Sequence, residues 1–172
     1  MEKLSGKLLW TIRILLTVAC GFMVGFILYN SIQNAVESAR QSSRAVEVVQ
    51  QVVAVVAPNS PIVTATGSAY DKLHAVVRVM AHFSEYALLG LLAGWCYRSY
   101  TNKKLWVLIP TISLTVLACV DEWLQTFTEG RGGHFVDVLV DMLGGGMGLV
   151  FALFTVWLTI KWIRKRSGNE AR

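Results

Sequence analysis

The chain is short, strongly apolar and poor in charge. Its 172 residues are 54% hydrophobic and only 16% charged, with a net charge of +5, whereas soluble domains are about 45–50% apolar and about 25% charged. This apolar excess is too large for one small soluble core and indicates a membrane protein. The basic residues gather beside apolar runs and form no nucleic-acid-binding motif, so nucleic acid is excluded as a partner.

Four apolar runs reach, or nearly reach, the length of about 20 residues that a helix needs to cross a bilayer. They are Leu9–Tyr29, Val79–Tyr97, Leu105–Phe127 and Val136–Trp157. The first is longer than the apolar part of a secretory signal, which has about 7–15 residues, so we expect an uncleaved anchor. The predicted fold class is all-α: a polytopic membrane protein with four transmembrane helices and a long external segment between the first and the second.

Lysine and arginine in the short flanks of these runs predict the orientation. The N-terminus, the connection 98–104 and the C-terminal tail are basic, whereas the connection 128–135 holds one arginine opposed by one glutamate. Both termini are therefore expected in the cytoplasm. The basic residues concerned are Lys3, Lys7, Arg13, Arg98, Lys103, Lys104, Lys161, Arg164, Lys165 and Arg166. The resulting division is an anchor (1–30), an external, partly amphipathic helical segment (31–78), a three-helix membrane core (79–161) and a basic cytoplasmic tail (162–172).

The external segment has a helical pattern of its own. Valines at positions 46, 49, 53 and 56 recur at helical spacing opposite polar residues, although a valine-rich sequence also suits a strand. Pro58 and Pro61 interrupt the pattern, and Ser68 followed by Asp71 resembles a helix start. We interpret the segment as a helix lying on the outer leaflet. The alternative is a lid or partner-binding element above the bundle.

Ionisable residues of three segments fall at the same end of their predicted spans. The second span runs inward, the third outward and the fourth inward, so the start of the second, the end of the third and the start of the fourth all meet the outer leaflet. A charged group at membrane depth is costly and usually functional, which predicts a ligand pocket there. A structural lattice of ion pairs is the alternative. The candidate ligand-binding residues are Arg78, His82, Glu85, Tyr86, Asp121, Glu122, Gln125, Arg131, Asp137 and Asp141.

A stripe of acidic and small residues predicts which face of the fourth span packs inward. Asp137, Asp141, Gly144 and Gly148 follow one another at intervals of three or four residues, so they share a helix face. Small residues at this spacing let membrane helices approach closely. We therefore expect both acids to point into the bundle.

The chemistry of the cluster is less specific than its location. No zinc-binding His-Glu-x-x-His, cysteine pair or nucleophile elbow is present, so neither a cofactor nor a metal is predicted. A site rich in acids with one histidine would suit Mg²⁺, Mn²⁺ or Ca²⁺ if the three helices converge. The sequence leaves open whether the chain is an enzyme. Candidates for general acid–base chemistry are His82, Glu85, Asp121, Glu122 and Asp141.

Two blocks of this sequence resemble the VanZ family. Residues 78–90 are similar to the family pattern R-K-x-x-H-F-x-E-Y-x-x-L-G. Residues 121–144 are similar to D-E-x-x-Q-x-F followed by G-R-x-x-x-x-D-x-x-x-D-x-x-G. The chain departs from these patterns at Val79, where a lysine is common, and at Leu124, where many members carry histidine. Both departures remove a polar group from the expected cavity.

The resemblance implies a multi-pass protein of the bacterial plasma membrane and a link to resistance against teicoplanin and related lipoglycopeptides. Together with the converging charges, it predicts binding or shielding of a cell-envelope component at the outer leaflet. The expected partners are the bilayer and a lipid-linked precursor, an anionic lipid or a lipoglycopeptide. The alternatives are a membrane-embedded hydrolase or transferase acting on a lipid-linked substrate, and a structural subunit whose acids only lock the bundle.

Overall fold

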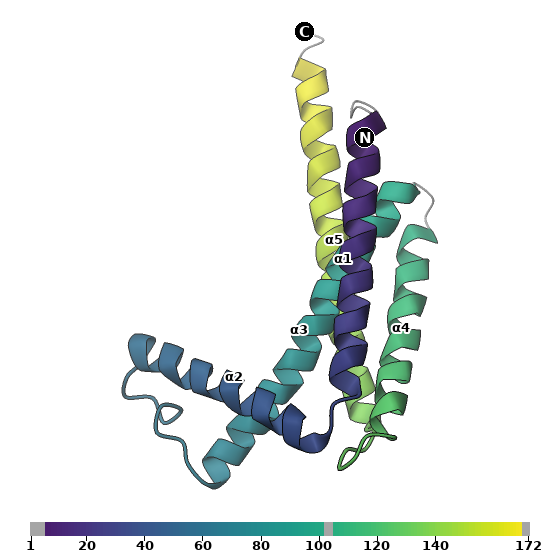
Figure 1. The fold of residues 1–172 in the computed structure, drawn as a ribbon. Helices are drawn as coiled ribbons and strands as arrows, with labels where there is room; N and C mark the ends of the chain where they lie inside the picture. Colours follow the sequence, from purple (N-terminus) through teal and green to yellow (C-terminus); the bar gives the residue numbers. More distant parts are fainter. Residues whose placement is uncertain (1–5, 102–104, 170–172) are drawn as a thin grey trace.

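The computed structural model of the protein describes residues 6–101 and 105–169, and within these ranges it consists of helices without strands (Figure 1). The helices are α1 (Gly6–Ser31), α2 (Ala35–Val56), α3 (Ser68–Tyr100), α4 (Leu105–Gln125) and α5 (Phe135–Asn169). By length and composition, α1, α3, α4 and α5 are able to cross a membrane. The predicted all-α fold with four spanning helices is confirmed. Of the predicted basic flanks, Lys3, Lys103 and Lys104 lie outside the described residues.

The centre of the bundle is the pair formed by α3 and α5, and the other two spanning helices, α1 and α4, pack against it. Helices α3 and α5 share the most extensive contact in the structure, and α1 and α4 each pack against α3. The start of α1 and the end of α5 lie at one end of the bundle, and the loop 126–134 lies at the other (Figure 1). Large apolar side chains such as Phe22, Leu143 and Val150 are exposed on its outside. In a bilayer they contact acyl chains, so their exposure carries no cost.

Small residues set the distance between α3 and α5. Gly144 faces the main-chain carbonyl of Phe83, and Gly148 faces that of Ala87. Gly90 of α3 meets the backbone of α5 in the same way. A Cβ at any of these three glycines would overlap a carbonyl oxygen, so the close approach depends on their lack of a side chain. The predicted glycine stripe therefore lies in the main interface of the bundle.

Helix α2 leaves the bundle and crosses the N-terminal part of α3 (Figure 1). The side chain of Asn34 caps it by accepting a hydrogen bond from the N–H of Glu37 at 2.9 Å. The N–H of Ala35 donates to the carbonyl of Glu129 at 3.1 Å, which ties the start of α2 to the loop 126–134. Val46 is fully buried. The helical interpretation of the valine-rich row is right, and the outer-leaflet position stays a prediction.

Two helices are longer than the apolar runs that predict them. α3 begins at Ser68, after Gly67, and continues without a break through Val79, where the second span is predicted to begin. The predicted boundary between external segment and membrane core therefore falls inside one helix. Polar residues in the first turns, such as Asp71 and Lys72, exclude this part from an apolar run without preventing helix formation. In the same way, α5 carries the predicted tail as a helix as far as Asn169.

Candidate functional site

A cluster of buried polar side chains lies at the end of the bundle opposite the chain termini. The end of α1, the middle of α3, the end of α4 and the start of α5 meet there. Asp121, Glu122, Gln125 and Asp141 are each at most 5% exposed, and Ser31 is 2% exposed. Such groups are costly to bury unless they have partners. The hydrogen-bond partners of each residue therefore indicate whether it stabilises the bundle or is available to a ligand.

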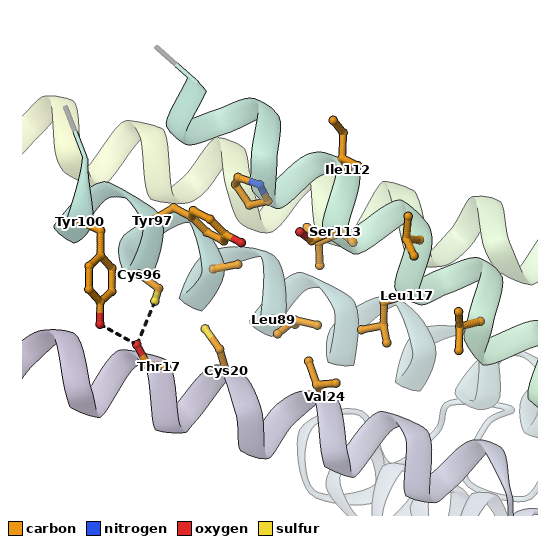
Figure 2. A pocket seen from close by; sticks show the side chains of 15 residues that line it. Thr17, Cys20, Val24, Leu89, Cys96, Tyr97, Tyr100, Ile112, Ser113 and Leu117 are labelled. Atoms are coloured by element: carbon orange, nitrogen blue, oxygen red, sulfur yellow. Dashed lines mark hydrogen bonds between the residues drawn. The ribbon is translucent and has the colours of Figure 1, made fainter. Parts of the chain in front are cut away.

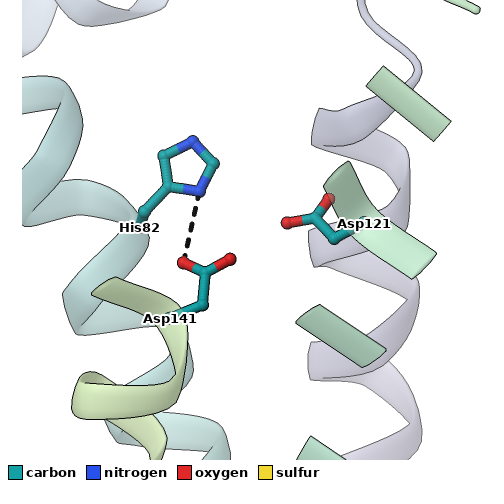
Figure 3. A group of neighbouring side chains, drawn as sticks. All are labelled: His82, Asp121 and Asp141. Atoms are coloured by element: carbon teal, nitrogen blue, oxygen red, sulfur yellow. Dashed lines mark ion pairs between the residues drawn. The ribbon is translucent and has the colours of Figure 1, made fainter. Parts of the chain in front are cut away.

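At the centre of the cluster, His82 of α3, Asp121 of α4 and Asp141 of α5 point into one shared space (Figure 3). The Nδ1 of His82 lies 3.6 Å from the Oδ1 of Asp141, which is an ion-pair distance but too long for a hydrogen bond. One nitrogen or oxygen of each residue lies within 4.8 Å of the other two. Neither carboxylate oxygen of the fully buried Asp141 accepts a hydrogen bond from residues 6–101 or 105–169.

The last residues of α1 complete this cluster. The hydroxyl of Ser31 donates to one oxygen of Asp121, and the hydroxyl of Tyr86 donates to the other at 3.4 Å. The amide of Asn30 donates to Glu85 at 3.2 Å. Sequence reasoning missed both α1 residues. The sequence feature that could have indicated them is that both are polar residues at the end of the first apolar run. The sequence does not show what the end of α1 packs against.

Glu122 is hydrogen-bonded to Gln125 and to the loop 126–134. It accepts a hydrogen bond from the amide of Gln125 at 2.9 Å and another from the main-chain N–H of His134 at 2.8 Å. The oxygen of Gln125 accepts from Arg131 at 2.8 Å, and Arg131 also donates to the carbonyl of Asn30 at 3.0 Å. These hydrogen bonds tie the end of α4 to the loop and to α1; they are not the arginine–carboxylate ion pairs of the lattice alternative, which stays a prediction. Asp121 and Glu122 are adjacent in the chain but have different hydrogen-bond partners: Asp121 contacts α1 and α3, and Glu122 contacts the loop.

Two polar cavities open beside the cluster, and two arginines line both of them. The larger, of about 370 Å³, lies between α2, the first turns of α3, the loop and the start of α5, where Asp137 and His134 line it. The smaller, of about 60 Å³, reaches His82 and Asp121 of the central cluster. Arg78 and Arg131 line both cavities. Within residues 6–101 and 105–169, Arg78 makes no hydrogen bond or ion pair.

The charge of Arg78 acts on Arg131. Burial lowers the pKa of Arg131 from its ordinary value, and the positive charge of Arg78 lowers this pKa further. The carboxylates of Asp121, Glu122 and Asp137 act in the opposite direction. The cavities thus combine two cations, one of them without a partner among the described residues, with acidic groups below and beside them.

A third, apolar cavity of about 750 Å³ lies between α1, α3 and α4 (Figure 2). Side chains such as Val24, Leu89 and Leu117 line it, and the hydroxyl of Thr17 shares a hydrogen bond with that of Tyr100 at 3.1 Å at one end. This cavity was not predicted from the sequence. Its lining has the same apolar composition as the rest of the membrane helices, so no pattern distinguishes it.

The sequence model of the family described as VanZ/LLP1 matches residues 16–158 of the chain. No curated protein and no solved structure matches it. The matched range contains both motif blocks, all of α2 and most of α1. The resemblance inferred from the blocks is thereby confirmed over a larger part of the chain.

Proposed function

The chain belongs to the VanZ/LLP1 family, and we propose that it binds the anionic head group of a cell-envelope lipid or lipid-linked component at the outer leaflet of a bacterial plasma membrane. The observation that carries the proposal is the pair of arginines lining both polar cavities, with Arg78 lacking a partner among the described residues. Phosphate and carboxylate groups match the planar fork of a guanidinium. An anion between Arg78 and Arg131 would also relieve the repulsion between them.

The size of the cavities and their surroundings support an amphiphilic ligand. The larger polar cavity, of about 370 Å³, is within the range of small-molecule sites, about 300–1,000 Å³. The apolar cavity between α1, α3 and α4 has room for part of an acyl chain. A ligand with a polar head and an acyl tail uses both kinds of surface. Teicoplanin and lipid-linked precursors share this chemistry, which supports a contribution to lipoglycopeptide resistance by capture or shielding.

The placement of charge along the bundle supports the proposed orientation. Both ends of the chain lie at one end of the bundle (Figure 1), and the basic flanks such as Lys7, Arg98 and Lys161 belong to that end. Basic flanks remain in the cytoplasm. With this end inside the cell, the arginine-lined cavities face the outer leaflet and α2 lies on the external side.

Replacing Arg78 by glutamine tests the head-group site. Purified wild type in detergent is expected to bind short-chain phosphatidylglycerol and teicoplanin more tightly than short-chain phosphatidylcholine, as measured by thermophoresis. Arg78→Gln is expected to weaken binding of the two anionic probes about tenfold or more, because it removes charge-assisted hydrogen bonds. Arg44→Gln, the same change at an exposed position of α2 that lines neither cavity, should leave the affinities unchanged. Equal affinities for wild type and Arg78→Gln would contradict the proposal.

A second candidate function, a hydrolase or transferase acting on a lipid-linked substrate, rests on the groups below the arginines. His82 and Glu85 line the smaller cavity together with Arg78 and Arg131, so a bound phosphate would lie above two acid–base groups. Glu85→Gln is then expected to abolish turnover of a radiolabelled lipid-linked precursor, followed by thin-layer chromatography, while Glu47→Gln on the exposed face of α2 retains it. Absence of turnover by the wild type would rule out this candidate and leave head-group binding in place.

A further inference from the structure

We propose that His82, Asp121 and Asp141 bind one divalent transition-metal ion, of the Mn²⁺ or Zn²⁺ type. This site borders the smaller arginine-lined cavity, which His82 and Asp121 line, but uses neither Arg78 nor Arg131. It therefore goes beyond head-group binding, and either property can exist without the other. No metal is predicted from the sequence, because the donors come from three separate segments and only their packing brings them together.

The geometry provides three donors around one point. One donor atom of each residue lies within 4.8 Å of the others, and the three side chains converge from α3, α4 and α5 (Figure 3). Nitrogen and oxygen donors bind such ions at about 2.0–2.2 Å. The donors would have to move closer to one another than in the structure to reach this distance from a common centre.

Asp141 is the independent indication that a cation belongs here. Its side chain is fully buried, and neither of its carboxylate oxygens accepts a hydrogen bond from the part of the chain that the structure describes. Among the same residues, the facing Nδ1 of His82 also lacks a hydrogen-bond partner. A buried carboxylate that accepts no hydrogen bond is strongly unfavourable, and more so within a membrane, even with the imidazole of His82 at 3.6 Å. A bound cation would provide both the opposite charge and the missing coordination.

The donor set and its surroundings favour a transition metal. One imidazole nitrogen with two carboxylates suits Mn²⁺ or Zn²⁺ better than Ca²⁺, which binds oxygen alone. The two carboxylates balance the charge of the ion. Asp121 is oriented by the hydroxyls of Ser31 and Tyr86, which is the arrangement of outer hydrogen bonds that metal ligands usually have.

Metal content of the purified full-length chain tests the proposal. Protein freed of any affinity tag and stripped with EDTA would be dialysed against Mn²⁺ or Zn²⁺ and analysed by inductively coupled plasma mass spectrometry. The wild type is expected to retain one ion per chain. Asp141→Asn should lose it, and His82→Gln should weaken binding by more than about tenfold. Glu47→Gln, at an exposed site on α2, is the control and should match the wild type.

Size-exclusion chromatography and circular dichroism would show that each variant is folded. If Asp141→Asn does not fold, the wild type and His82→Gln decide the question. Retention of neither ion by the wild type would overturn the proposal. Equal retention by wild type and His82→Gln would overturn it as well. Because no lipid is present, the result is independent of the test of Arg78.

Discussion

Replacing Gly148 by alanine is expected to lower the free energy of unfolding by about 1–3 kcal/mol, the usual cost of overpacking. The added Cβ would overlap the main-chain carbonyl of Ala87, which cannot move aside without separating α3 from α5. This interface is the most extensive in the structure. It also carries His82 opposite Asp141, so the substitution would widen the gap between their side chains.

Gly146 of the same helix provides the matched control. It is exposed, and a Cβ there would meet nothing within 4 Å. Gly146→Ala is expected to be neutral or to stabilise the helix by about 0.5–1 kcal/mol, because alanine loses less backbone entropy than glycine. Unfolding by sodium dodecyl sulfate in mixed micelles measures both changes. A stability of Gly148→Ala equal to that of Gly146→Ala would show that the two helices are not held at this distance.

Replacing Gln125 by leucine is expected to destabilise the protein by about 2–4 kcal/mol, since each buried polar group left without its partner costs about 1–3 kcal/mol. Gln125 is fully buried, donates to Glu122 and accepts from Arg131. Leucine has a similar size but can do neither. Both partners would lose a hydrogen bond, and the loop 126–134 would lose one of its links to α4.

The same substitution at Gln51, exposed on α2, is the control and should change the stability by no more than about 0.5 kcal/mol. Hydrogen exchange adds a local measurement. In Gln125→Leu, the amide of His134 is expected to lose protection, because its acceptor Glu122 is no longer held in place. Unchanged stability and unchanged exchange at His134 would mean that this network does not support the loop.

The sequence alone determined where the membrane helices are. A spanning helix satisfies its backbone internally and needs a continuous apolar run, which is a local property that can be read from one segment at a time. The same reasoning underestimated α3, which extends back to Ser68. The reason is that hydropathy detects the apolar part of a helix, whereas helix formation continues through polar turns containing residues such as Asp71.

The sequence also determined that the charges of three segments belong to one end of the bundle, because the direction of each span follows from its order. Only the tertiary structure decided which groups face one another. Asp121 lies beside His82 and Glu122 holds the loop, although they are neighbours in the chain. Ser31 joins the cluster from α1. Such contacts depend on the rotation and tilt of each helix. The close approach of α3 and α5 at glycines controls this rotation and tilt, whereas an apolar run does not specify them.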